Sequence, residues 1–212
     1  MKVLIISPPR CGSTSLLRNI SKLADYDMIF EPYMGNDPLT SHIKEKIPYP
    51  FDVPNNCIVK IITNQLPKKY VHDFLKIHTF FNFINSIYKD YDRVILLNRR
   101  NEKEHFESYV NLRILNKNKQ NRYEHSPWFF QDIENKLSTV DITDIIFYKN
   151  QINIISTNLS IPIIYYEDLY GKDRNKSLEI IKSWKLDINN GELNEILNPK
   201  FRYRQPKNKD II

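Results

Sequence analysis

The sequence predicts an α/β fold with three layers, in which a mostly parallel central sheet is flanked by helices on both faces. Short apolar runs recur along the 212 residues, and segments with helical spacing of apolar residues alternate with them. Strands that alternate with helices in this way are typical of a parallel sheet. A polar turn rich in hydroxyl residues also separates the first apolar run from the first helical segment. This order is typical of the opening of a nucleotide-binding α/β unit.

The first four elements are expected before residue 64. Residues 3–6 form a continuous apolar run, as expected of a strand buried on both faces. Residues 15–23 carry apolar side chains at helical spacing and are expected to form a helix. Two more strands are expected at 28–30 and at the β-branched run 57–63 (CIVKIIT). The intervening stretch 33–56 is rich in Pro and Asn and is expected to loop over the surface.

The remaining elements continue the alternation. They are expected to be a helix at 74–88, a strand at 93–97, a helix at about 102–115, one or two helices between 126 and 156, a strand at 161–166 and a helix at 177–186. Ser126 and Pro127 are typical of a helix start, with Ser as the N-cap and Pro at the first helical position. No internal repeat or linker interrupts the pattern. Residues 1–212 are therefore expected to form a single domain.

The composition favours anionic partners. The formal net charge is +6 and the pI is about 9.1, which suits nucleotides, phosphates or sulfates, although a merely solvated basic surface has the same composition. Cys11 and Cys57 are too few for a disulfide framework and have no metal-site spacing, which fits reduced thiols in a cytoplasm. The first apolar run stops at Pro8, too early for a signal peptide, and no segment approaches the roughly 18 apolar residues of a membrane helix.

The turn PPRCGSTSLL, residues 8–17, has the residue types of a phosphate-binding loop. Gly12 allows a close approach of the backbone to a ligand, Arg10 adds a fixed positive charge, and 13–15 offer three hydroxyl groups. Those hydroxyls equally suit simple capping of the following helix. The Walker A and dinucleotide patterns both fail, because the turn has one Gly and no Lys. A phosphatase loop fails as well, since Leu17 stands where its Arg is needed, and Cys11 is expected to be a small loop residue.

Four segments, taken in order, resemble the sulfotransferases that use 3′-phosphoadenosine-5′-phosphosulfate (PAPS). PPRCGSTSLL resembles their 5′-phosphosulfate loop, and FEPY (30–33) is similar to an element of carbohydrate sulfotransferases. RVILLNRRNEKEHFESY (93–109) resembles the 3′-phosphate element, an Arg followed eight residues later by a Ser, although Asn101-Glu102 replaces the frequent Asp-Pro. IIYYEDLYGKDRNKSLEIIKSWKL (163–186) resembles a strand and helix found in many members. The resemblance implies a P-loop-NTPase-like fold.

The resemblance also implies a reaction and a set of site residues. The reaction is transfer of a sulfuryl group from PAPS to a hydroxyl, of a carbohydrate rather than a steroid or phenol, with 3′-phosphoadenosine-5′-phosphate (PAP) as product and no metal. Arg10 and Glu31 are the expected catalytic residues. Arg10 stabilises charge, because its pKa above about 12 excludes proton donation, and Glu31 is the general base. The expected PAPS-binding residues are Arg10, Cys11, Gly12, Ser13, Thr14, Ser15, Arg100, Ser108 and Arg204.

Several residues keep two interpretations. Arg99 can share the 3′-phosphate with Arg100 or be a surface cation, and Lys60 can line the acceptor site or reach solvent from a strand end. Arg204 lies in FRYRQPKNK, which suits either closure over the nucleotide or a basic tail. The Glu167–Asp168 pair looks like a two-carboxylate site, but the resemblance implies a structural role.

Two other functions remain open. One is a nucleotide kinase or P-loop hydrolase, against which the missing Walker Lys argues. The other is a non-catalytic protein of the same fold that binds nucleotide or nucleic acid. On the sulfotransferase interpretation the partner is a carbohydrate or small-molecule acceptor, with neither nucleic acid nor a membrane segment expected, and the compartment is cytoplasmic.

Overall fold

The structure is a computed structural model that describes residues 1–33, 52–63, 65–71, 73, 76, 78–109, 139–189 and 191–197. Within these residues, five strands form one sheet in the order β2-β3-β1-β4-β5, and the pairs are parallel. The strands are β1 (Lys2–Ser7), β2 (Asp27–Phe30), β3 (Cys57–Ile62), β4 (Arg93–Asn98) and β5 (Ile163–Tyr165). The predicted α/β fold with a parallel central sheet is confirmed.

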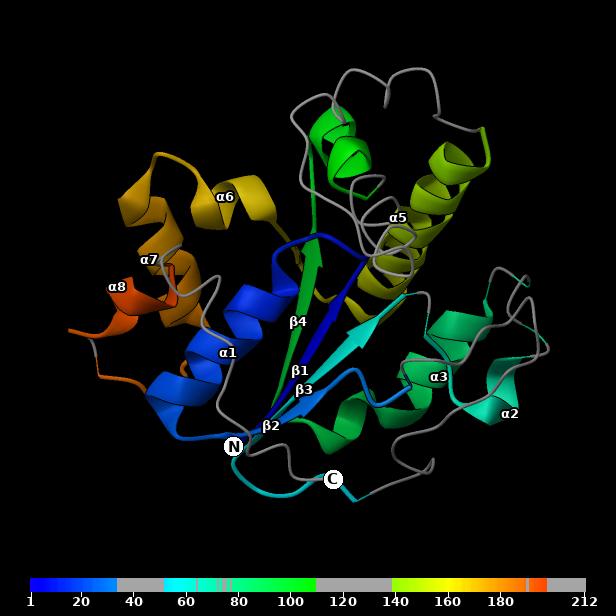
Figure 1. Cartoon of the computed structure of the whole chain (residues 1–212). Coiled ribbons are helices and arrows are strands. Elements are labelled where there is room, and N and C mark those ends of the chain that lie inside the picture. The colour runs from blue at the N-terminus through cyan, green and yellow to red at the C-terminus, as the bar shows by residue number, and fades with distance from the viewer. Residues whose placement is uncertain are drawn as a thin grey trace, which may run out of the picture.

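Helices cover both faces of the sheet (Figure 1). One face carries α1 (Ser13–Ala24), α7 (Arg174–Ser183) and α8 (Leu193–Ile196), with α6 (Tyr166–Tyr170) directly after β5. The other face carries α3 (Thr79–Ile87) and α5 (Thr139–Leu159), and the short α2 (Lys68–Val71) and η1 (Tyr88–Asp90) adjoin α3. A further helix covers 102–109 within the described part of the chain.

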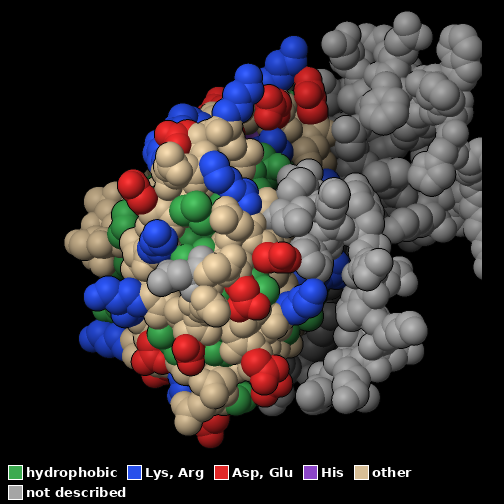
Figure 2. Space-filling model, turned by 90° about the vertical axis from the view of Figure 1, so that its left-hand side faces the viewer, with side chains coloured by type: hydrophobic (Ala, Val, Ile, Leu, Met, Phe, Trp, Pro, Cys, Tyr) green, Lys and Arg blue, Asp and Glu red, His purple; other side chains and the backbone are tan. Residues whose placement is uncertain are grey.

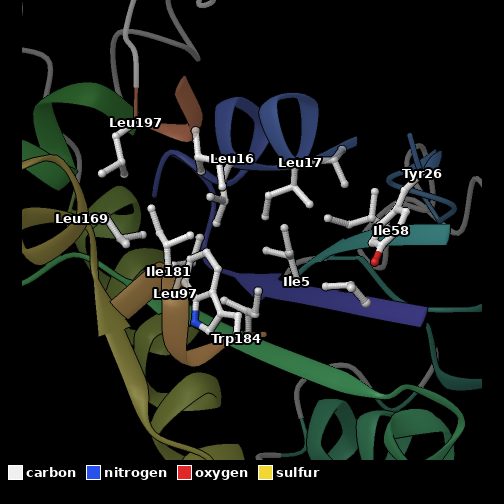
Figure 3. Packing of buried hydrophobic residues seen from close by; sticks show 14 of the residues in the cluster. Ile5, Leu16, Leu17, Tyr26, Ile58, Leu97, Leu169, Ile181, Trp184 and Leu197 are labelled. Carbon is white, nitrogen blue, oxygen red and sulfur yellow. The ribbon is translucent and has the colours of Figure 1, made fainter. Parts of the chain in front are cut away.

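The alternating side chains of the strands divide the core into two clusters. Val3 and Ile5 of β1 pack with apolar residues of α1, α7 and α8, whereas Leu4 and Ile6 pack with residues of α3 and α5. Figure 3 shows the first cluster, in which Ile5 lies among side chains from the helices. All four β1 side chains are fully buried. Burial on both faces explains why the strand is apolar without interruption in the sequence.

The structure corrects several predicted boundaries. The helix expected at 74–88 begins at Thr79, and the strand expected at 161–166 ends at Tyr165, because Tyr166 begins α6. The helix expected at 177–186 begins at Arg174, where the side chain of Asp173 accepts a hydrogen bond from the backbone of Lys176 as the N-cap. Apolar spacing did not detect that cap, and α2 and α8 were not predicted.

The parallel arrangement decides where a functional site can form. Because the strands run in one direction, the segments that follow β1, β2, β3, β4 and β5 all leave from the same edge of the sheet (Figure 1). Open parallel sheets bind their ligands at this carboxyl edge. No helix among the described residues is long and apolar enough to cross a membrane.

Candidate functional site

The turn between β1 and α1 has an unusual backbone. Arg10 and Gly12 both have a positive φ, of 67° and 75°, which is the left-handed region. At Gly12 a side chain would also collide with the ring of Tyr166, because an added Cβ would lie 2.8 Å from a ring carbon. The sequence therefore needs Gly at position 12 for its backbone and for the packing of α6. α1 then begins with its first-turn N–H groups at the carboxyl edge.

The hydroxyl groups of Ser13 and Thr14 bind neighbouring elements instead of capping α1. Gly12 is the N-cap residue and makes no side-chain cap. The Ser13 hydroxyl accepts a hydrogen bond of 2.8 Å from Ser7 at the end of β1, and the Thr14 hydroxyl accepts one of 2.7 Å from the Lys60 ammonium. The capping interpretation is therefore wrong for these two side chains.

Lys60 and Glu31 form a buried ion pair between the ends of β2 and β3. The Lys60 ammonium binds Glu31 Oε1, and Gln65 donates a hydrogen bond of 2.9 Å to Glu31 Oε2. Only 2% of the Lys60 side chain is exposed, so the interpretation in which Lys60 reaches solvent is wrong. Burial lowers the pKa of Lys60; the carboxylate of Glu31 opposes this effect, and nearby Arg18 and Arg10 add to it.

The helix at 102–109 contacts the turn through two side chains. Arg10 Nε donates a hydrogen bond of 3.1 Å to the hydroxyl of Ser108. One turn earlier, the fully buried His105 places Nε2 2.7 Å from the carbonyl oxygen of Pro9 and 3.8 Å from the sulfur of Cys11. A carbonyl only accepts hydrogen bonds, so Nε2 carries the proton. His105 thus fixes the carbonyl that precedes Arg10.

Burial controls the protonation of both side chains in this contact. It lowers the pKa of His105 to about 4, although the hydrogen bond to Pro9 opposes the shift. The imidazole is therefore neutral at pH 7. Burial also raises the pKa of the Cys11 thiol far above its ordinary value. A thiol that stays protonated is a poor nucleophile, in keeping with the prediction that Cys11 is a small loop residue.

Arg100 lies at the other end of the carboxyl edge, after β4. Its guanidinium binds both carboxylate oxygens of Asp168, at 3.3 and 2.8 Å, and stacks 4.2 Å from the ring centre of Tyr165. Its side chain is nevertheless 56% exposed. The Glu167 carboxylate accepts hydrogen bonds from the backbone N–H groups of Arg100 and Asn101. Glu167 and Asp168 thus fix the turn after β4, as the structural interpretation of YEDL expects.

Arg99 is placed differently from its neighbour. Only 8% of Arg99 is exposed, its guanidinium forms an ion pair of 3.1 Å with Glu104, and it stacks 4.5 Å from the ring centre of Tyr166. The alternative in which Arg99 is a surface cation is therefore wrong. The ring of Tyr166 also packs closely against Gly12. The stack of Arg99 on this ring therefore helps to hold the turn between β1 and α1.

The structure brings many of the expected site residues together at the carboxyl edge. Arg10 meets Ser108, and Glu31 is joined to Thr14 through Lys60. Arg204, the helix start at Ser126 and most of the loop expected at 33–56 lie outside the described residues.

Sequence reasoning missed Gln65 and His105. Gln65 had a signal, because it follows β3 at the carboxyl edge of the sheet. His105 had one as well, because it precedes Ser108 by three residues and so shares its helix face.

The surface charge does not gather into one basic stripe on the face formed by α1, α6, α7 and α8. Figure 2 shows this face, on which Lys and Arg side chains are interspersed with Asp and Glu. A nucleic-acid backbone needs a continuous positive surface. This face therefore gives the nucleic-acid alternative no support.

No protein-family model matches the chain, and no curated protein is significantly similar to it. Among the described residues there is also no group of three or more His, Cys, Asp or Glu side chains that can hold a metal ion. The chemistry of the site is therefore inferred from its own residues.

Proposed function

We propose that the chain transfers a sulfuryl group from PAPS to a hydroxyl group of a carbohydrate. The observation that carries the proposal is the pairing, at one edge of a parallel sheet, of an anion-binding turn with a buried carboxylate. The turn offers Arg10 and the N-terminus of α1, and the carboxylate of Glu31 is joined to Thr14 of the same helix through Lys60. An anionic donor and a general base are the two requirements of this transfer.

The donor set suits the oxygens of a phosphosulfate. A guanidinium, hydroxyl groups and helix N–H groups all donate hydrogen bonds, and negatively charged oxygens accept them. Arg10 is also held in place by Ser108, 3.1 Å away. A positive charge that is fixed before the reaction stabilises developing negative charge without reorganisation.

In the proposed reaction, the hydroxyl oxygen of the acceptor attacks the sulfur of PAPS in line with the bond to the 5′-phosphate. A new S–O bond to the acceptor forms as the S–O bond to the phosphate breaks. The 5′-phosphate of PAP leaves with the electron pair of that bond. Glu31 takes the acceptor proton, so that a sulfate ester, PAP and a protonated carboxyl result. General-base catalysis of this kind contributes about 10²- to 10⁴-fold.

Arg100 is proposed to bind the 3′-phosphate of PAPS. Its side chain is more than half exposed, and its guanidinium stacks on the ring of Tyr165. Its partner Asp168 has a second cation, because Lys176 binds the same carboxylate at 2.8 Å. Asp168 therefore keeps a counter-charge when Arg100 turns to a phosphate, and the planar guanidinium matches phosphate oxygens as a fork.

The first test is a thermal unfolding experiment with PAP, compared with ATP plus Mg²⁺. Ligand at 100 times its Kd adds about 2.7 kcal/mol, which raises the midpoint by roughly 5–10 °C in a domain of this size. We expect the rise with PAP, and we expect Arg100→Ala to abolish it. Lys182→Ala is the matched control, because Lys182 is an exposed cation in the last turn of α7.

Two results would overturn the proposal. If Mg-ATP shifts the midpoint and PAP does not, the kinase or hydrolase interpretation is favoured. If PAP shifts wild type and Arg100→Ala equally, Arg100 does not bind the 3′-phosphate. A PAP-specific shift would justify a screen of carbohydrate acceptors with labelled PAPS.

A further inference from the structure

We propose that Lys60 and Gln65 are positioning residues that hold the Glu31 carboxylate in one orientation beside Thr14 of α1. The inference rests on the proposed function, in which Glu31 takes the acceptor proton. Neither residue is proposed to touch PAPS or the acceptor.

Each oxygen of Glu31 has its own donor from a different segment. Lys60 of β3 binds Oε1, and Gln65, three residues after the end of β3, donates to Oε2 at 2.9 Å. Two donors on opposite oxygens prevent the carboxylate from rotating. A carboxylate has about four acceptor positions, so both oxygens keep capacity for the hydrogen bond of an acceptor hydroxyl.

Lys60 occupies a position where packing favours an apolar residue. It lies in the middle of β3, and its neighbours Val59 and Ile61 are fully buried. A buried ion pair costs so much desolvation that apolar residues of similar volume often replace it without loss of stability. Stability alone therefore does not account for a lysine here. Its contacts do, because the ammonium reaches Glu31 and Thr14 together.

Lys60 also links the ion pair to the first turn of α1. Burial, Arg18 and Arg10 all disfavour its charge, and Glu31 is the partner that favours it. The hydrogen bond from Lys60 to Thr14 ties the carboxylate to the helix whose N-terminus faces the proposed phosphosulfate. The base and the donor-binding turn are thereby held at a fixed separation, as in-line transfer requires.

The experiment follows the Glu31 carboxyl carbon by NMR during a pH titration of protein labelled with ¹³C-glutamate. Glu31→Gln assigns the signal. In Lys60→Met we expect the proton affinity of Glu31 to rise at least tenfold, because a buried carboxylate has lost its cation. Lys60→Arg should restore most of the wild-type titration, and Gln65→Leu should produce a smaller rise. Lys182→Met, which removes an exposed lysine of α7, is the control.

An unchanged Glu31 titration in Lys60→Met would overturn the proposal, as would equal shifts in Lys60→Met and Lys182→Met. Lys60→Gln keeps a hydrogen-bond donor but removes the charge. The Glu31 titration is measured in this variant too, so that the result does not depend on one apolar substitution. PAP affinity is measured on the same samples by calorimetry. Absence of PAP binding to wild type would overturn the proposed function, whereas a normal PAP affinity with an unmoved Glu31 titration would overturn only the positioning roles.

Discussion

The carboxyl edge of the sheet holds two ion pairs of similar chemistry in opposite environments. At the β2–β3 end, the side chains of Lys60 and Glu31 are 2% and 9% exposed. At the β4–β5 end, those of Arg100 and Asp168 are 56% and 16% exposed. Water therefore reaches Arg100 of the second pair, but neither partner of the first.

This difference separates a fixed element from an exchangeable one. A buried charge that loses its partner has no water to replace it, so the Lys60–Glu31 geometry is fixed before a reaction begins. An exposed guanidinium loses little when it changes partner, so Arg100 is free to exchange Asp168 for a phosphate. In the proposed function, the fixed end of the edge holds the base, and the exchangeable end binds and releases the nucleotide.

The largest expected effect on stability is that of Lys60→Met. We expect a loss of about 3–5 kcal/mol in the free energy of unfolding, because Glu31 remains buried without a cation. The double variant Lys60→Met/Glu31→Gln should recover most of the loss. Urea denaturation at pH 7 measures both. If Lys60→Met costs no more stability than the exposed control Lys182→Met, the Lys60–Glu31 pair is hydrated and does not differ from the Arg100–Asp168 pair.

The next effect concerns His105, a buried titratable group that donates to a carbonyl. Its pKa is lowered from 6.5 to about 4, so between these values the unfolded chain binds a proton that the folded chain does not. Stability therefore falls as the pH decreases from about 6.5 to 4, by about 3 kcal/mol in total. His105→Gln should lose less stability than wild type between pH 7 and pH 5. Equal losses would show that His105 is solvated in the folded state.

A smaller effect is expected at Gly12, where the turn meets α6. Gly12→Ala places a side chain at a φ of 75° and against the ring of Tyr166. The left-handed backbone alone costs about 1–2 kcal/mol, and displacement of the ring adds to it. Denaturant unfolding measures the loss. If Gly12→Ala/Tyr166→Ala costs as much as the single variants Gly12→Ala and Tyr166→Ala added together, the ring contributes nothing to the cost of Gly12→Ala.

The smallest expected effect is that of Asp168→Asn. Because Arg100 is more than half exposed and can be hydrated in place of its ion pair, the midpoint of thermal unfolding should stay close to that of wild type. PAP affinity should not fall, since Arg100 is released from its competitor. A large loss of stability would mean that Asp168 is essential for holding the turn after β4. The Arg100–Asp168 pair would then be as fixed as the Lys60–Glu31 pair.

The sequence by itself determined the architecture, and it named most residues of the candidate site. The apolar runs of β1, β3 and β4 are unmistakable because both faces of a parallel sheet are buried. The turn at 8–15 was predicted to bind an anion because Gly, hydroxyl groups and a cation lie there within a few residues. Both patterns lie within a short stretch of sequence, so they can be recognised without knowledge of the fold.

Only the tertiary structure decided which of these residues meet. Lys60 had two interpretations in the sequence, and its burial beside Glu31 depends on the pairing of β2 with β3. The contacts of His105 with Pro9 and of Arg10 with Ser108 join residues almost 100 positions apart. Such contacts arise because parallel strands bring all their carboxyl ends to one edge, and no local pattern of residue types records which of those ends become neighbours.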